Sequence, residues 1–204
     1  MTEPTPTHHP GQPKRIADFG TLAEALDYAA LGPTGLNFYS GKGVLTESLP
    51  YASLRMQALE LARKLLGTGL RPGDRVGLLA ESDGDFARAF FACQYAGLVP
   101  APLPLPAAFG GKEGYISFLR RMIQAADAHA VFGPAVLSDW LAEAVDGLGL
   151  KCAGLIADLA EARMVPQERL PAPEALAYLQ FSSGSTRFPL GVAVTQAAFM
   201  ANAH

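Results

Sequence analysis

The feature that most restricts the fold of this chain is a regular alternation of short apolar segments with longer amphipathic ones. Helical periodicity occurs in four segments, at residues 51–66, 83–96, 113–126 and 135–145. Strand-like runs stand between and after them, at residues 76–80, 129–132 and 150–155. Strands that alternate with helices at this spacing favour parallel pairing. The pattern therefore predicts an α/β fold, with a mainly parallel sheet that is flanked by helices on both faces.

The N-terminal part of the chain carries different signals. Residues 1–14 include four prolines and two histidines, so they are expected to form a flexible leader ahead of a domain that spans 15–204. Thr21 and Glu24 form a capping box at the start of a short helix. An N-terminal hairpin is predicted by two strand-like runs around a Gly-Lys-Gly turn, at residues 36–40 and 44–49.

Composition narrows the class of protein. Of the 204 residues, 50% are hydrophobic and 17% are charged, which is enough apolar material for a sizeable core. A net charge of −3 argues against nucleic acid or an anionic membrane as the main partner. The most apolar region, 86–109, holds Arg88, Gln94 and four prolines, which argues against an integral membrane segment. Cys93 and Cys152 are expected to be packing residues of a reduced, cytoplasmic protein.

Three local features are expected to be architectural. Pro72 and Gly73 form a turn pair, and Asp74 is well placed to brace that turn. Alternating prolines across 98–104 exclude a central position in an antiparallel sheet and predict an edge strand or a strand end. His129 stands alone at the start of a strand, so a hydrogen-bonded structural role is favoured over a catalytic one.

The polar segment 160–173 predicts a surface connector, and after it the chain changes character. Residues 175–181 form an apolar run of β type, and a stretch of hydroxyl residues and glycines follows. A second strand is then expected at 191–194, and Thr195 is expected to cap a final helix. Small hydroxyl residues and glycines let a backbone approach an anion and supply hydrogen-bond donors. A phosphate cradle and an ordinary Ser/Gly turn both fit this pattern. The stretch contains neither the G-x-x-x-x-G-K-S/T of a Walker loop nor the G-x-S-x-G of a nucleophile elbow.

The full string resembles the phosphate-binding loop of the adenylate-forming superfamily, which includes acyl-CoA synthetases, fatty-acyl-AMP ligases, luciferases and adenylation domains. That loop commonly reads S/T-S-G-S/T-T-G-x-P-K-G-V. The residues that match it are Ser182, Ser183, Gly184, Ser185, Thr186, Pro189, Gly191 and Val192. Arg187 replaces the usual Gly and Leu190 replaces the usual Lys, and the Arg resembles the fatty-acyl-AMP ligase branch, whose loop often reads S-G-S-T-R-x-P. Weaker points of resemblance lie at 71–76 and 96–104.

This resemblance implies an ATP-dependent ligase with Mg²⁺ as a further cofactor. The fatty acid substrate would be activated as acyl-AMP and passed to an acyl carrier protein or to coenzyme A. Contacts to ATP would come from Ser182, Ser183, Gly184, Ser185, Thr186, Arg187 and Gly191. Catalytic and metal-binding residues of the superfamily lie farther downstream, so the resemblance assigns none here.

We therefore expect residues 15–204 to be the N-terminal portion of an AMP-binding domain that is inactive by itself. The alternative from another functional class is a non-catalytic binding or interaction module built on the same half-fold. A reading frame that continues past His204 would favour the enzyme, whereas a natural stop codon would favour the module.

Overall fold

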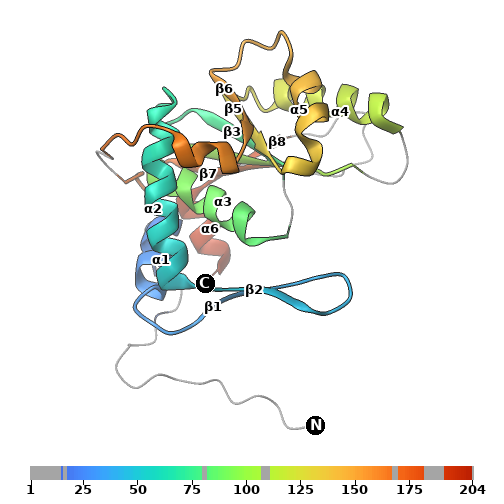
Figure 1. Ribbon diagram of the computed structural model, residues 1–204. Helices are drawn as coiled ribbons and strands as arrows, with labels where there is room; N and C mark the ends of the chain where they lie inside the picture. The colour runs from blue at the N-terminus through green and yellow to red at the C-terminus, as the bar shows by residue number, and fades with distance from the viewer. Residues whose placement is uncertain are drawn as a thin grey trace.

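The computed structural model describes residue 15 and residues 18–79, 82–106, 111–166, 170–181 and 191–203. Its elements form three layers, with a parallel sheet between two groups of helices (Figure 1). In chain order they are α1 (Leu22–Ala29), β1 (Gly35–Tyr39), β2 (Leu45–Pro50), α2 (Tyr51–Gly67), β3 (Arg75–Leu79), α3 (Gly84–Ala96), β4 (Val99–Leu103), α4 (Gly111–Ala125), β5 (Ala130–Gly133), η1 (Ala135–Leu137), α5 (Ser138–Val145), β6 (Cys152–Leu155), η2 (Ala157–Glu161), β7 (Leu176–Phe181), β8 (Gly191–Thr195) and α6 (Gln196–Ala203). The predicted leader, residues 1–14, lies outside the described residues.

The central sheet has the strand order β4-β3-β5-β6, and all its neighbouring strands are parallel. Side chains of β3 and β5 alternate between its two faces, as they must in a pleated strand. Val76 and Leu78 of β3 belong to the core beneath α1, α2 and α3. Val131 of β5 belongs to the core on the opposite face, with Leu119 of α4 and Leu141 of α5. The predicted α/β fold, with helices on both faces and an N-terminal hairpin (β1–β2), is confirmed.

The proline-rich strand β4 lies at the edge of this four-stranded sheet, as predicted. The amide of Val99 donates to the carbonyl of Asp74 at 2.9 Å. Because successive amides of a strand point to opposite sides, Pro100 and Pro102 occupy positions whose missing N–H would face away from β3. The prolines therefore remove no ladder hydrogen bond between β3 and β4.

Two predicted helix starts are confirmed at the level of hydrogen bonds. At α1, the amide of Glu24 donates to Thr21 Oγ1 at 3.1 Å, and the Glu24 carboxylate accepts from the amide of Gly20 at 2.8 Å. The carboxylate thus reaches one residue farther back than a standard capping box requires. At α6, the amide of Ala198 donates to Thr195 Oγ1 at 3.1 Å.

A largely buried arginine fastens the β1–β2 hairpin to the helical layer. Arg88 of α3 donates through Nε to Gln57 of α2 at 2.6 Å and through Nη2 to Glu47 of β2. Gly84 leaves the space for this contact, since a Cβ there would lie 2.1 Å from Glu47 Oε2. The hairpin is therefore held by a charge-assisted network in addition to its own ladder.

Two segments differ in detail from their predicted form. The helix expected at 135–145 is divided into the 3₁₀ turn η1 and the helix α5. The expected connector, 160–173, begins within η2 and then lies against the end of α2, where the amide of Val165 donates to the carbonyl of Arg63 at 3.1 Å. This close approach is possible because Gly67, the last residue of α2, has no side chain to hold the connector away.

Candidate phosphate-binding site

The two strands that flank the predicted phosphate loop pair with each other. β7 and β8 form an antiparallel ladder in which Phe181 lies opposite Gly191. Residues 182–190 lie outside the described residues, and these include the predicted ligands Ser182, Ser183, Gly184, Ser185, Thr186 and Arg187. Of the predicted site residues, the structure therefore places Gly191 alone. The pairing of Phe181 with Gly191 brings the two ends of the loop together.

Gly191 has a local packing role in this pair. A Cβ at this position would lie 3.0 Å from Cε1 of the Phe181 ring. Because few real Cβ contacts are that short, a larger residue would push the ring away from β8. Glycine therefore lets the Phe181 ring lie close to the first residue of β8, at the base of the loop.

The direction of β7 determines where the loop leaves the sheet. Leu176, the first residue of β7, lines one cavity together with Val99, the first residue of β4. Phe181, the last residue of β7, packs against the cluster that contains Leu103, the last residue of β4. β7 therefore runs in the same direction as β4, and the loop starts at the carboxyl end of the parallel strands. In open α/β sheets, this end is where ligands bind.

Two polar groups near the carboxyl end of the sheet, the Asp83 carboxylate and the Tyr115 hydroxyl, already have hydrogen-bond partners. A cavity of about 140 Å³ is lined there by Leu79, Asp83, Gly133 and other residues. The Asp83 carboxylate caps α3 by accepting from the amide of Phe86 at 2.8 Å. The Tyr115 hydroxyl donates to the carbonyl of Pro104 at 3.0 Å, and burial raises the pKa of Tyr115 to about 12. Both groups are thus used for structure, and Tyr115 stays protonated at neutral pH.

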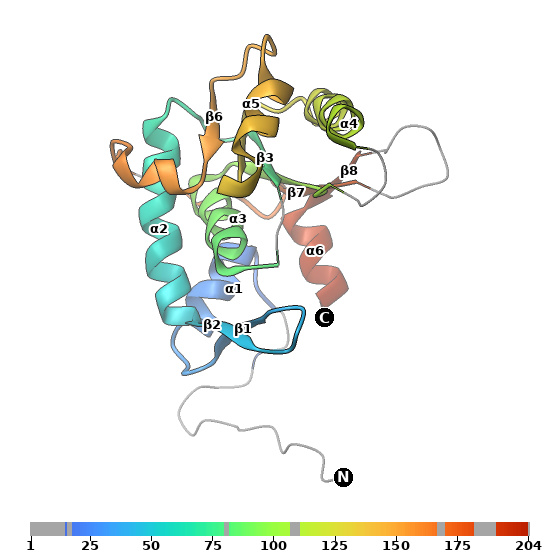
Figure 2. The same cartoon turned by 45° about the vertical axis from the view of Figure 1, so that its right-hand side comes forward.

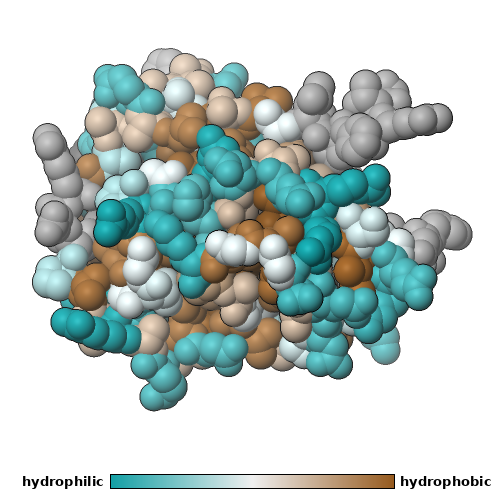
Figure 3. All heavy atoms as spheres, turned by 90° about the horizontal axis from the view of Figure 1, so that it is seen from above, coloured by the Kyte–Doolittle hydropathy of each residue, from teal (hydrophilic) through white to brown (hydrophobic). Residues whose placement is uncertain are grey.

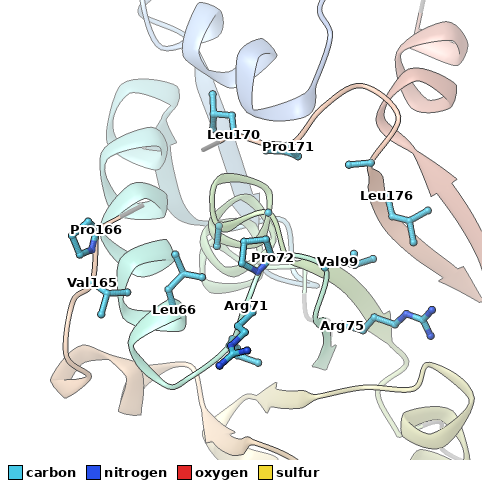
Figure 4. A pocket seen from close by; sticks show the side chains of 15 residues that line it. Leu66, Arg71, Pro72, Arg75, Val99, Val165, Pro166, Leu170, Pro171 and Leu176 are labelled. Carbon is cyan, nitrogen blue, oxygen red and sulfur yellow. The ribbon is translucent and has the colours of Figure 1, made fainter. Parts of the chain in front are cut away.

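A larger cavity lies at the opposite end of the sheet. Its volume is about 810 Å³, and it lies between the end of α2, the connector after η2 and the starts of β4 and β7 (Figure 4). Most of the lining is apolar, including Leu66, Val165 and Leu176. Arg75 borders it, but its guanidinium points away from the other labelled side chains and bonds to the carbonyl of Ala126 at 3.1 Å. This cavity is therefore separate from the base of the predicted phosphate loop.

A charged cluster braces the amino ends of three strands. Asp74, which is 9% exposed, accepts from Lys151 Nζ at 2.5 Å and from the amide of Arg71 at 2.8 Å. His129 accepts from the amide of Arg75 through Nδ1 at 3.2 Å, and its Nε2 lies 3.4 Å from Asp74 Oδ1. The bracing role predicted for Asp74 and the hydrogen-bonded role predicted for His129 both agree with these contacts.

The pKa of Asp74 reflects opposing effects. Burial raises the pKa of its carboxyl group, but the hydrogen bonds from Lys151 and the Arg71 amide, with the nearby His129, bring the pKa below its usual value. Asp74 therefore stays ionised at neutral pH and holds the turn that begins β3.

Two glutamines near the loop strands were not identified as site residues from the sequence. Gln94 of α3 and Gln196 of α6 are each 1% exposed and bond to each other at 2.7 Å. Gln94 also donates to the carbonyl of Ala177 in β7 at 2.7 Å. The sequence offers one signal of a buried polar contact, because Gln94 follows Cys93 in an otherwise apolar part of α3. It does not reveal the partner, which is distant in sequence.

The described segments contain neither a metal-ligand cluster nor a membrane-spanning helix. No group of three or more His, Cys, Asp or Glu residues in these segments is placed to hold a metal ion. None of their helices is both long and apolar enough to cross a bilayer. Seen from above, apolar patches on the surface are interrupted by hydrophilic side chains (Figure 3).

Comparisons with known proteins agree with this geometry. The family described as AMP-binding enzyme matches residues 36–204. A Caulobacter vibrioides protein assigned as an acyl-CoA synthetase is 54% identical over 188 residues, which make up 92% of this chain and 33% of that protein. The long-chain-fatty-acid–AMP ligase FadD26 of Mycobacterium marinum is 33% identical over 161 residues, which make up 76% of this chain and 26% of that protein.

Solved structures agree as well. A structure from a study of fatty acyl-adenylate ligases from E. coli and L. pneumophila matches with a TM-score of 0.87 and 39% identity, over 94% of this chain and 35% of the other. The chain thus spans about a third or less of the length of these relatives. Since the family match extends over most of its 204 residues, the chain belongs to the AMP-binding enzyme family, whose members are adenylate-forming enzymes.

Proposed function

We propose that this chain supplies the ATP-phosphate loop of a ligase that activates a fatty acid as acyl-AMP. In this reaction a carboxylate oxygen attacks the α-phosphorus of ATP. The bond from the α-phosphorus to the bridging oxygen breaks, and pyrophosphate leaves. Charge therefore accumulates on the leaving β- and γ-phosphates, where positioned N–H and O–H donors lower the barrier. Residues 182–186 carry such donors without bulky side chains.

The observation that carries this proposal is the pairing of Phe181 with Gly191 at the carboxyl end of the sheet. It requires residues 182–190 to leave and re-enter the fold at one place. A loop rich in serine, threonine and glycine at that place would present its donors at the end of the sheet where α/β proteins bind ligands. The site residues of the proposal are Ser182, Ser183, Gly184, Ser185, Thr186, Arg187 and Gly191.

Arg187 would supply the cation that the superfamily loop usually takes from a lysine. Leu190 occupies the position of that lysine in this chain. A guanidinium can bond to a phosphate or carboxylate with two parallel hydrogen bonds. We propose that Arg187 meets one of these groups when the active site is assembled. Mg²⁺ would accompany the phosphates of ATP and would neutralise part of their charge.

The final acceptor is proposed to be the phosphopantetheine thiol of an acyl carrier protein or of coenzyme A. The name of one relative, an acyl-CoA synthetase, supports coenzyme A, whereas the carrier protein is suggested by the resemblance of the loop to the fatty-acyl-AMP ligase branch. The thiol would attack the acyl carbonyl, and AMP would leave. We propose that this occurs in the cytoplasm and that residues 15–204 contribute a portion of the AMP-binding domain.

Two measurements on the 204-residue chain test this proposal. ATP should bind, and replacing Ser183 and Thr186 with Ala and Val should weaken binding by about tenfold or more, the loss expected for hydrogen bonds to a charged group. Thr46→Val is the matched control, because Thr46 is exposed on β2 and donates to the carbonyl of Phe38. ATP–pyrophosphate exchange with fatty acids should be absent, because holding one end of ATP does not orient the carboxylate.

The outcomes distinguish part of an adenylate-forming enzyme from a non-catalytic interaction module. No binding of ATP to the wild-type chain would overturn the role of the loop and support the non-catalytic interaction module. Exchange above the level of a loop-deleted control would instead overturn the expectation that these 204 residues are inactive alone.

A further inference from the structure

A chain of buried amide hydrogen bonds links four elements around the phosphate-loop strands. Its two side chains are Gln94, on α3, and Gln196, the first residue of α6. The amide of Leu22, at the start of α1, donates to Gln196 Oε1 at 2.9 Å. Gln196 Nε2 donates to Gln94 Oε1 at 2.7 Å, and Gln94 Nε2 donates to the carbonyl of Ala177 on β7 at 2.7 Å.

These three hydrogen bonds, from the Leu22 amide through Gln196 and Gln94 to the Ala177 carbonyl, form a relay. Which group donates at each step follows from the backbone groups at its two ends. The Leu22 amide can only donate, so the oxygen of Gln196 must face it and its NH₂ group must face Gln94. The oxygen of Gln94 then accepts, which leaves its NH₂ group for the carbonyl of Ala177. Both glutamine side chains thus have one permitted orientation, fixed by a backbone donor at one end and a backbone acceptor at the other.

The surroundings of the relay are apolar. Leu22, Ala177 and Met200 form a buried cluster there, with Phe90 and Phe199 packed against it. Figure 2 shows α6 following directly from β8, with α1 and α3 on the same side of the sheet. Because water does not replace a lost partner in such a cluster, removing either amide leaves a buried polar group unpaired.

We propose that Gln94 and Gln196 are positioning residues that hold both strands of the β7–β8 hairpin, and therefore both ends of the phosphate loop. Ala177 lies four residues before the end of β7, and Gln196 directly follows β8. The amide of Gln196 also donates to the carbonyl of Ala175 at 2.9 Å. The relay thus ties the hairpin to α3 and to the start of α1, and its effect on ATP rests on the proposed function.

The wild-type chain provides the first test, by hydrogen exchange of its backbone amides. Leu22 is the first residue of α1, a position whose amide normally has no intrahelical partner and exchanges rapidly. The relay requires this amide to be protected and to exchange at a rate similar to that of the β7–β8 amides. Rapid exchange at Leu22 would overturn the relay even if no variant could be purified.

Variants provide the second test. Gln94→Met and Gln196→Met keep the length of the side chain but remove the amide. Each should speed exchange in residues 176–181 and 191–203 by about tenfold or more. Tyr95→Phe is the matched control, because Tyr95 is the next residue of α3 and its buried hydroxyl donates to Asp27 of α1 at 2.7 Å. It should speed exchange in α1 without doing so in the hairpin.

ATP affinity separates positioning from a general loss of stability. Both Met variants should raise the Kd for ATP by about fivefold or more, whereas Tyr95→Phe should leave it unchanged. Equal effects of all three variants, or unchanged exchange in the hairpin, would refute the positioning role. If the wild-type chain binds no ATP, the proposed function fails, while the exchange measurements still decide whether the relay holds the hairpin.

Discussion

Gly67→Ala should destabilise the chain although it introduces a better helix-forming residue. An ideal Cβ at Gly67 would lie 1.7 Å from the carbonyl oxygen of Arg163 and 2.8 Å from its carbonyl carbon. Since real Cβ contacts are essentially never shorter than 3.0 Å, that oxygen must retreat by about 1.3 Å in a closely packed region. The obstacle is backbone, so a change of rotamer cannot relieve it. The connector must move, and the hydrogen bond from Val165 to Arg63 is strained with it.

The expected change in the free energy of unfolding is the balance of one gain and two losses. Alanine gains at most about 1 kcal/mol in helix propensity, whereas overpacking costs about 1–3 kcal/mol and a weakened hydrogen bond about 1 kcal/mol more. The net loss in the free energy of unfolding should be about 1–3 kcal/mol. For a chain of this size, that corresponds to a fall in Tm of roughly 3–8 °C.

Gly114→Ala is the matched control. Gly114 also lies within a helix, α4, but no heavy atom would come within 4 Å of its Cβ. This variant should gain about 0.5–1 kcal/mol from helix propensity alone. Thermal melts and urea titrations of both variants check the prediction. If Gly67→Ala is as stable as Gly114→Ala, the close approach of the connector to α2 does not exist in solution.

The remaining predictions concern pH, thiol reactivity and the loop. Because the pKa of Asp74 is lowered in the folded chain, its stabilising contribution is present above the unfolded pKa and is lost as the pH falls through the folded value. The urea midpoint should therefore fall more steeply below about pH 4 in the wild type than in Asp74→Asn; parallel profiles would contradict this. Burial raises the pKa of both thiols, but Cys93 is fully buried whereas Cys152 is only partly buried. A thiol reagent should therefore modify Cys152 well before Cys93 in the native chain and both cysteines after unfolding; rapid native labelling of Cys93 would count against its burial. In a ligase that contains this chain, Arg187→Ala should lower acyl-AMP formation by about tenfold to a hundredfold, the effect of about 1.5–3 kcal/mol expected for one charge-assisted hydrogen bond; full activity of Arg187→Gly would remove the electrostatic role.

Local chemistry in the sequence was sufficient to predict most individual elements. Periodicity located the helices and strands of the parallel sheet, and Thr21 and Thr195 marked two helix starts. The alternating prolines predicted the edge position of β4. These predictions succeeded because capping, helical periodicity and missing amides act within a few residues of the chain.

The function was inferable only through resemblance of the loop string, because hydroxyl residues and glycine also make ordinary turns. The structure adds the location of the loop's ends, where Phe181 meets Gly191 beside Leu103 of β4. The connector shows the limit of sequence patterns. Its polar residues predicted exposure, but the space above Gly67 placed part of it against α2.

The sequence by itself thus determined the order of the main helices and strands, the edge strand and the resemblance of the loop. The tertiary structure alone decided that β7 runs alongside β4 and that Gln94 and Gln196 meet. Gln196 lies 102 residues from Gln94 and 174 residues from Leu22 in the chain. Local periodicity specifies which face of a helix is buried. It does not specify which distant amide lies opposite that face, because this depends on how the layers stack once the core has closed.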